Sequence, residues 1–223
     1  KKLFHEVLEK CRYTSLDDEE EYSIDVIQPE KIEFKQNSYE DGENSIISFP
    51  EFLLLVLDVC TGGEQPASHY QPDKLIEKFD ALKTHFTAGE FYEKMLYYRL
   101  LLDYYTIRRD IKDGQGNYSL ILKGPKDDND KLKQYQSMLY VSTEAFYNWL
   151  KPYLRKLEQD ELQSCAEMLA FLKKEDNERH GVLPARKDLS YKASGNIRYW
   201  FWRLDYYLWE QRSTFFNEEE QKI

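Results

Sequence analysis

The sequence predicts a mainly α-helical, bundle-like domain with a small β element near its N-terminus. Apolar residues recur at helical spacing through most of the chain after residue 47, whereas residues 22–35 alternate between apolar and polar side chains, as strands do. A length of 223 residues is enough to bury a sizeable core. We therefore expect an acidic segment with a short β element over residues 1–47 and one helical domain over residues 48–223.

Charge limits the classes of function. Lysine and arginine total 31 and aspartate and glutamate total 41, which gives a net charge of −10. Residues 1–49 hold 13 acidic side chains against 6 basic ones, and Asp17–Glu21 is an unbroken acidic run. This balance disfavours a broadly basic nucleic-acid binder but leaves room for a local basic patch. The longest uncharged apolar run, Phe52–Leu57, is too short to cross a bilayer.

The cysteines indicate a reducing compartment. Cys11, Cys60 and Cys165 are odd in number, widely spaced and without a C-x-x-C motif, so we expect free thiols and neither a disulfide framework nor a zinc site. The N-terminus carries no signal-peptide pattern. We expect a cytoplasmic protein and, because the sequence begins at Lys1 without an initiator methionine, a piece of a longer one.

Local patterns predict the first elements. Residues 22–27 and 31–35 alternate apolar and polar side chains, which predicts a hairpin or two edge strands. The run Ser48–Glu51 combines an N-cap serine, an early proline and a capping-box glutamate. The apolar Phe52–Cys60 that follows predicts a buried helix, and Thr61–Gly63 ends it.

Two helices are expected next, from about residue 73 to 84 and from about residue 87 to 112. The longer one has an apolar stripe at steps of 4, 3, 4 and 3, formed by Phe91, Met95, Tyr98, Leu102 and Tyr105. Residues 113–117 are typical of a turn, and Tyr118–Leu122 predicts a short strand.

Further helices are expected at about residues 127–141, 143–157 and 162–172. Pro152 should kink or break the second of these, because proline lacks an amide hydrogen. Residues 173–193 are polar and are expected to be flexible.

The most enzyme-like pattern falls in the N-terminal β element. Asp25 on the first expected strand is followed on the second by Glu33 and Lys35 in an acid-x-lysine arrangement. Many metal-dependent nucleases use a strand aspartate and a Glu-x-Lys to hold Mg²⁺ and activate water. The alternative is a charged hairpin whose solvent face happens to carry these residues, and no helix that would cradle such a site is evident.

Histidines and common catalytic motifs indicate no further site. The histidines are far apart and form no H-E-x-x-H or H-x-x-x-H pair; they are His5, His69, His85 and His180. The sequence contains no G-x-S-x-G, no G-x-x-x-x-G-K-[ST] and no G-x-G-x-x-G. We expect the histidines to be surface or capping residues and predict no metal or cofactor site in this chain.

A basic segment is expected at the end of the long helix. Arg108, Arg109 and Lys112 lie together there, with Arg99 upstream. These side chains are candidates for contact with DNA or with another domain. The alternative is a set of cations that stabilises a helix C-terminus. Asp103 lies between the arginines and is expected to be a paired core acid.

The last helix, from about residue 194 to 212, is rich in aromatic side chains. Seven of the residues 197–209 are aromatic. One stripe of the helix, at steps of 4, 3 and 4, contains Arg198, Trp202, Asp205 and Trp209. We expect a helix that is either central or sandwiched between two domains, with this stripe packed in the core around an internal Arg–Asp pair. The alternative is a ligand cage or a base-stacking platform.

Four segments, in order, resemble one protein family. Ser48–Leu57 is similar to its D-F-P-N-F-L-L helix, and Tyr98–Arg109 to its R-x-L-x-D-x-Y-x-I-x-R helix. Gln136–Ser142 resembles its Q-S-M-L-x-V-S segment, and Ile197–Glu210 resembles its R-Y-x-F-x-x-L-D-Y-x-L-W helix. The family is the prokaryotic group of GmrSD-type proteins. They join an N-terminal ParB/sulfiredoxin-like domain to a C-terminal HNH nuclease domain and are associated with restriction of modified phage DNA.

The resemblance covers about residues 46–210 and implies the central helical region without either catalytic half. The R-x-Y-x-W and D-G-Q-Q-R motifs of the nucleotide half are absent, and the sequence ends at Ile223, where the S-V-E-H-x-x-P-Q segment of the HNH half would be expected. No catalytic residue of the family matches a position here. Nuclease or NTPase activity, with an NTP and a divalent metal as cofactors, is therefore expected of the parent protein.

The expected role is a non-catalytic domain that positions the NTP-sensing and HNH halves of a nuclease. Its partners would be these flanking domains and, through the parent, DNA; no membrane contact is expected. One alternative is a stand-alone Mg²⁺ nuclease that uses Asp25, Glu33 and Lys35. The other is a protein-interaction domain that binds through the exposed part of the aromatic helix.

Overall fold

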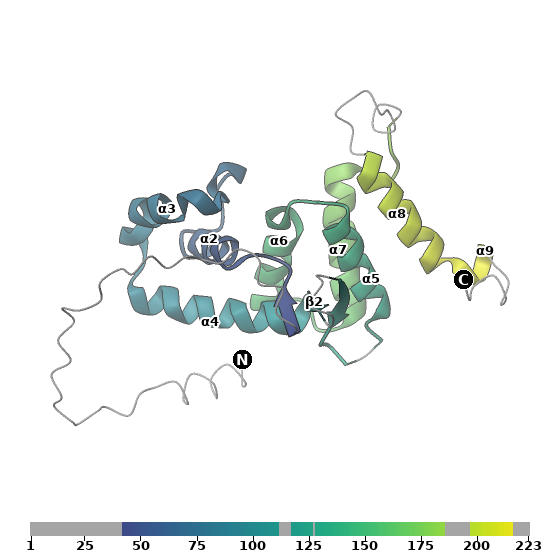
Figure 1. Ribbon diagram of the computed structural model, residues 1–223, viewed down its shortest axis with the longest axis horizontal. Coiled ribbons are helices and arrows are strands. Elements are labelled where there is room, and N and C mark those ends of the chain that lie inside the picture. Colours follow the sequence, from purple (N-terminus) through teal and green to yellow (C-terminus); the bar gives the residue numbers. More distant parts are fainter. Residues whose placement is uncertain (1–41, 112–116, 127, 186–196, 216–223) are drawn as a thin grey trace.

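The computed structural model describes residues 42–111, 117–126, 128–185 and 197–215. This part of the chain is mainly helical and contains a small antiparallel sheet, so the predicted fold class is confirmed (Figure 1). In chain order the elements are β1 (Gly42–Ser45), α2 (Phe49–Cys60), α3 (Leu75–Leu82), α4 (Ala88–Tyr105), β2 (Ile107–Ile111), β3 (Tyr118–Leu122), α5 (Asp130–Val141), α6 (Phe146–Glu158), α7 (Cys165–His180), α8 (Ile197–Glu210) and α9 (Arg212–Phe215), with 3-10 turns at Ala67–His69, Pro72–Lys74 and Lys83–His85. The hairpin expected at residues 22–35 lies outside the described ranges.

Capping boxes begin α2 and α4. The Ser48 hydroxyl accepts a hydrogen bond from the Glu51 amide at 3.4 Å, and Glu51 Oε2 accepts one from the Ser48 amide at 2.7 Å. Thr87 and Glu90 repeat this arrangement at the start of α4. Each box satisfies amide groups that have no acceptor inside the helix. Both helix starts therefore follow from local sequence, as predicted.

α2 is buried on nearly all sides. Leu54, Leu55 and Leu57 are 0% exposed, and the helix packs against α3 and α4. Even Asp58 near its C-terminal end is 0% exposed. The prediction of a buried helix over Phe52–Cys60 is confirmed.

α4 ends at Tyr105, about two turns earlier than predicted. The following residues form strand β2 instead. Gln136 of α5 stabilises this change from helix to strand. Its side-chain amide nitrogen donates to the Tyr105 carbonyl at 3.0 Å, and its side-chain amide oxygen accepts from the Ile107 backbone amide at 2.9 Å. Thr106 and Ile107 are β-branched, which suits an extended backbone better than a helix. A contact from a distant helix thus converts the expected last turns into a strand.

The sheet has the strand order β1–β2–β3, and both strand pairs are antiparallel. Ser45 lies opposite Arg108, and Ile107 lies opposite Leu122. β3 has the predicted limits. Ile107 and Ile111 are buried, and α5 packs against β2 and β3. The sheet therefore connects β1 to the end of α4 and to α5.

α6 runs without interruption through Pro152, so the predicted break is wrong, and the alternative of a kink stays a prediction. The proline has no amide hydrogen, so the Asn148 carbonyl loses its helical donor. Arg179 of α7 donates a hydrogen bond to that carbonyl instead. A contact between two helices compensates for the bond that is missing within one.

α7 continues to His180, whereas its apolar pattern predicts an end near Leu172 and flexible residues beyond. Met168, Leu172 and Asp176 follow one another at four-residue steps, and all three are buried. The packed face therefore extends beyond the apolar residues. Gly181, with a φ of 81°, follows the last residue of the helix.

α8 lies at one edge of the molecule, where it packs on α5 (Figure 1). The prediction of a central helix is therefore wrong, and the alternative of a helix sandwiched between two domains stays a prediction. None of the helices in the described ranges combines the length and the apolar character that crossing a bilayer requires.

Candidate functional site

The residues predicted for a Mg²⁺ site lie outside the described ranges. Asp25, Glu33 and Lys35 all precede residue 42, and Lys112 of the basic segment falls in the undescribed link between β2 and β3. Among the described residues, no three His, Cys, Asp or Glu side chains form a group that would hold a metal ion. The stand-alone nuclease therefore stays a prediction.

The arginines of the basic segment are bound within the fold. Arg99 on α4 donates to Asp103 at 2.8 Å, and Arg108 Nη1 on β2 lies 4.0 Å from the same carboxylate. Arg109 donates to the Ser45 carbonyl on β1 at 2.9 Å. The pairing predicted for Asp103 is confirmed. The helix-end position predicted for Arg108 and Arg109 is wrong because α4 ends before them, and their contact with DNA stays a prediction.

Three of the four residues in the stripe predicted for the core side of α8 face solvent. Arg198 and Asp205 are exposed and do not pair with each other, Trp202 is 38% exposed, and Trp209 is partly buried. The buried residues of this helix are Tyr199, Trp200 and Tyr206. The stripe prediction is wrong because both faces of α8 are aromatic. Hydrophobicity alone does not distinguish them, and polar partners on α5 and α7 select the tyrosine face.

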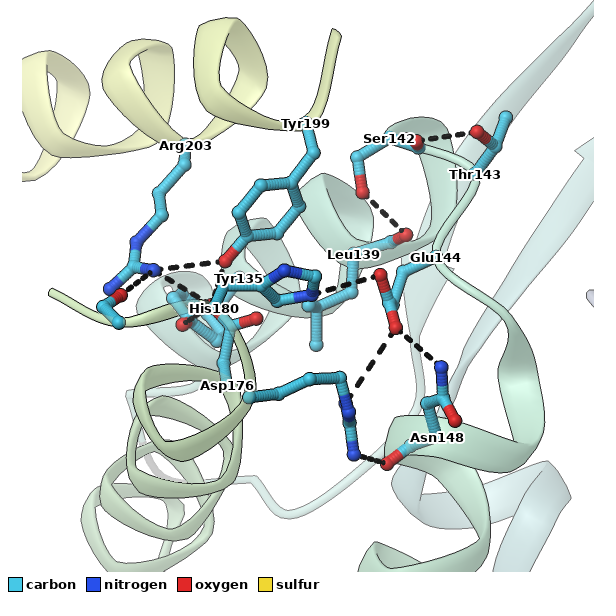
Figure 2. Close-up of polar contacts among 12 residues, drawn as sticks. Tyr135, Leu139, Ser142, Thr143, Glu144, Asn148, Asp176, His180, Tyr199 and Arg203 are labelled. Carbon is cyan, nitrogen blue, oxygen red and sulfur yellow. Dashed lines mark hydrogen bonds and ion pairs between the residues drawn. The ribbon is translucent and has the colours of Figure 1, made fainter. Parts of the chain in front are cut away.

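A network of polar side chains joins α5, α6, α7 and α8 (Figure 2), and we call it the polar junction. Its members are Tyr135, Glu144, Asn148, Asp176, Asn177, Arg179, His180, Tyr199 and Arg203. Because it gathers acidic, basic and phenolic groups at low exposure, it is the candidate site in the described residues.

Asp176 is central to the polar junction and is 2% exposed. Its Oδ2 atom accepts hydrogen bonds from the Tyr135 hydroxyl at 2.6 Å and from the Tyr199 hydroxyl at 2.7 Å. Arg203 Nη1 lies 3.7 Å from the same oxygen and donates to the Tyr199 hydroxyl at 3.0 Å. The Oδ1 atom is buried and has no hydrogen-bond partner among the described residues. This one carboxyl group therefore connects α5, α7 and α8.

The two tyrosines of this group act as donors. Burial, and then the neighbouring Asp176 carboxyl, raise the pKa values of Tyr135 and Tyr199 well above the ordinary value of 10.0. Both phenols therefore stay protonated at neutral pH. Their protons are directed to the buried carboxyl group, which suits a structural hydrogen bond better than a catalytic base.

Glu144 and His180 form the other half of the polar junction. His180 Nε2 lies 3.1 Å from Glu144 Oε2, and the imidazole stacks on the Tyr199 ring with centroids 4.1 Å apart. Asn148 donates to Glu144 Oε1 at 2.7 Å, and Arg179 Nη1 lies 3.7 Å from that oxygen. Burial raises the pKa of Glu144, but these hydrogen bonds and charges outweigh it, so the pKa lies below its ordinary value.

Local backbone geometry places these two residues. Thr143 has a φ of 64°, which turns the chain between α5 and α6. Glu144 consequently lies just before α6, where the helix dipole favours a carboxylate. His180 is the last residue of α7 and lies one turn after Asp176, so both side chains are on the same face of that helix.

The Glu144–His180 pair has the form of an acid–imidazole pair in general-base sites. No serine, threonine or cysteine side chain within the described ranges contacts His180, however, and Tyr199 covers one face of the ring. The nearby Ser142 hydroxyl is buried and donates to the Leu139 carbonyl. The geometry therefore fits a tie between helices better than a site of proton transfer.

We expect Glu144→Gln to lower the free energy of unfolding at pH 7 by about 1–2 kcal/mol, because hydrogen bonds to an ionised acceptor are lost. The variant should also respond less to acid. The folded pKa of Glu144 lies below 4.5, so its carboxylate contributes fully above pH 4.5 and loses this contribution as the pH falls through the folded value.

Urea unfolding of the wild type and the variant between about pH 7 and about pH 3 measures this effect. The two stabilities should converge as the pH falls. Glu178→Gln, on the same helix as His180 but 62% exposed, serves as the control with little change. A gap between wild type and Glu144→Gln that stays constant down to the lowest pH would contradict a role for the ionised carboxylate.

A second buried polar cluster joins α2 to α6. Asp58 Oδ2 accepts hydrogen bonds from the Tyr70 hydroxyl and from Lys151 Nζ, the latter at 3.0 Å. Its Oδ1 atom accepts one from the Gln65 amide at 2.8 Å. Burial, and then Asp58, raise the pKa of Tyr70 above its ordinary value. Both oxygens of the Asp58 carboxylate therefore accept hydrogen bonds from groups within the fold.

Gly63 allows α6 to approach the end of α2. It has a φ of 78°, and a Cβ atom there would lie 2.6 Å from Arg155 Nη1. Lys151 and Arg155 both donate to the Gly63 carbonyl, at 3.3 and 3.4 Å. The turn Thr61–Gly63, which ends α2 as predicted, is therefore also bound by two basic side chains of α6.

The polar junction has one sequence pattern that indicates it. Met168, Leu172, Asp176 and His180 form a row at four-residue steps on α7. A polar residue that continues a buried row is expected to be buried and paired. Glu144 and Arg203 carry no comparable local pattern, because their partners lie on other helices.

Comparisons with known proteins give no relative: no family model, no curated protein and no solved structure matches this chain.

Proposed function

We propose that this chain is a non-catalytic helical domain that holds the NTP-sensing and HNH halves of a GmrSD-like nuclease in a fixed arrangement. One observation supports this role above others. Several polar side chains of the family-like segments bind other elements of the same fold, as is expected of a stiff domain.

The segment Tyr98–Arg109 illustrates this observation. The Tyr98 hydroxyl donates to Glu158 on α6 at 2.7 Å. Asp103 pairs with arginines on α4 and on β2, where the helix meets the sheet. Each of these contacts joins α4 to a neighbouring element or fixes its end.

The segments Gln136–Ser142 and Ile197–Glu210 behave in the same way. Gln136 is 0% exposed and bonds both the end of α4 and the start of β2. In α8, Tyr199 donates to Asp176 of α7. Buried polar networks whose groups are largely satisfied favour one rigid arrangement, and rigidity is what a positioning domain requires.

The test compares the isolated chain with the natural gene product that contains it. An antibody raised against this chain should detect a product several tens of kDa heavier than 26.8 kDa. With Mg²⁺ and an NTP, the natural product should cleave DNA that carries modified bases, and the isolated chain should not.

Tyr199→Phe in the natural product probes the positioning role. This change removes one hydrogen bond to Asp176, so NTP binding should persist while DNA cleavage falls by about tenfold. Glu178→Ala, an exposed change on α7, is the matched control. A natural product of about the same mass as the chain would overturn the proposal. So would Mg²⁺-dependent cleavage by the isolated chain, and its loss in Asp25→Ala would then favour the stand-alone nuclease.

A further inference from the structure

α8 has a second apolar face, on the side away from its buried tyrosines. Phe201 is 57% exposed and Leu204 is 51% exposed, while Ile197 and Leu208 on the same side are half-buried. These four residues are separated by steps of 4, 3 and 4, which is the a/d spacing of a coiled coil. We call them the α8 seam. A contiguous exposed apolar face of this kind marks an interaction surface.

We propose that the α8 seam binds the α8 seam of a second copy of this chain in an antiparallel pair. This inference goes beyond the proposed function and does not depend on it. The charges beside the seam indicate which partner fits. Arg198 and Asp205 lie seven residues apart along one edge of the seam, and both are exposed. Neither has an ion-pair partner among the described residues.

The charged edge is complementary to itself. In an antiparallel pair of helices the same edge of each helix meets, so that edge must carry both charges to attract its copy. When Phe201 lies across from Leu204 of the second copy, Arg198 lies across from Asp205. The two-fold axis that relates the two copies generates this ion pair twice. In the same register Ile197 of one copy lies across from Leu208 of the other, at each end of the seam.

Other registers bring like charges together. A shift by one heptad in one direction places Asp205 against Asp205 of the second copy and Arg198 against Arg212. A shift in the other direction places Arg198 against itself. In a parallel pair the charged edge would meet the edge that carries Tyr207, which has no charge. Electrostatics therefore select one antiparallel register.

The interface is small, so the dimer is expected to be weak. Residues 197–208 form a helix about 18 Å long. A pair of such helices buries roughly 1,200 Å² or less, the low end of specific interfaces. We expect a dissociation constant of about 10 µM, which makes the dimer visible only at raised protein concentration.

Sedimentation velocity of the purified 223-residue chain tests the proposal. Dimer should appear as the concentration rises from about 1 µM to about 200 µM. Leu204→Glu should weaken the dimer by at least about tenfold, because it places a charge in the seam. Ile76→Glu, on α3 and 77% exposed, is the control and should leave the dimer unchanged. Circular dichroism confirms that both variants keep the fold.

A charge swap tests the register. Arg198→Asp and Asp205→Arg should each weaken the dimer, and the double variant should restore it, because the opposite charges face each other again. A monomer at every concentration would overturn the proposal, as would a dimer that Leu204→Glu leaves intact or that the double variant fails to restore. If Leu204→Glu instead detaches a flanking half in the natural product, that half covers the seam and the dimer is excluded.

Discussion

Replacing Asp176 by alanine is expected to lower the free energy of unfolding by about 3 kcal/mol. The carboxyl group is 2% exposed and accepts hydrogen bonds from Tyr135 and Tyr199. Without it, both buried hydroxyls lose their acceptor. Arg203, whose side chain is 16% exposed, also loses the nearby acidic charge. A loss of this size corresponds to a fall in melting temperature of about 6–12 °C for a chain of this length.

Glu178→Ala is the matched control for this change. Glu178 lies on the same helix, and its carboxylate is 3.7 Å from Lys174 in a pair whose side chains are 69% and 62% exposed. An exposed pair of this kind contributes at most about 1 kcal/mol. Urea unfolding of both variants, followed by tryptophan fluorescence, measures the difference. Equal losses in Asp176→Ala and Glu178→Ala would contradict a central role for the buried carboxyl group.

The site of the loss also matters. Asp176 holds α8 to α7, so the variant should increase amide hydrogen exchange in α8 before it affects α2. Tyr199→Phe, which removes a single donor, should show the same order with a smaller loss of about 1 kcal/mol. Faster exchange in α2 with α8 unchanged would mean that Asp176 does not attach α8.

Replacing Asp58 by alanine is expected to cost about 3 kcal/mol, because Lys151 is left as a largely buried charge without its acid. Asp58 is 0% exposed, and its carboxylate lies 3.0 Å from Lys151 Nζ, whose side chain is 17% exposed. Lys151→Met breaks the same ion pair by removing its basic partner. It should cost less, because Tyr70 and the Gln65 amide still donate to the carboxylate.

The double variant Asp58→Ala with Lys151→Met should be more stable than the two single losses predict. Removing both charges leaves neither one buried alone, so the coupling energy is expected to be about 2 kcal/mol. The unpaired Tyr70 hydroxyl is present in both variants that lack Asp58 and largely cancels in the cycle. The control cycle uses Lys156 and Glu161, a pair with side chains 38% and 50% exposed.

The control pair should show a coupling energy below about 0.5 kcal/mol, since water already solvates both groups. Urea unfolding of the seven proteins in the two cycles, which share the wild type, gives both values. A coupling energy for Asp58 and Lys151 no larger than that of the control would show that the buried pair does not act as a unit. The link between α2 and α6 would then rest on apolar packing alone.

Local patterns in the sequence determined the starts of two helices and the character of α2. Ser48 with Glu51, and Thr87 with Glu90, close their capping boxes within three residues, so no distant part of the chain is needed. The limits of β3 were likewise predicted. The apolar run of Phe52–Cys60 required burial whatever surrounded it.

Tertiary contacts decided where other elements end. The sequence after Tyr105 continues a helical pattern. Gln136, however, hydrogen-bonds the Tyr105 carbonyl and the Ile107 amide, and a strand follows. Pro152 lies inside an unbroken helix because Arg179 supplies the missing hydrogen bond to Asn148. In both places the deciding donor or acceptor lies about thirty residues away in the sequence, beyond the reach of local periodicity.

The polar junction was decided in the same way. Arg198, Trp202 and Asp205 were expected in the core, and they face solvent because Tyr199 on the other side of α8 finds Asp176. A helix that is aromatic all round has no unique buried face of its own. The sequence by itself predicted the approximate positions of the helices and the starts of α2 and α4. Only the tertiary structure decided which face of α8 is buried, because a buried carboxyl group stabilises whichever donors reach it.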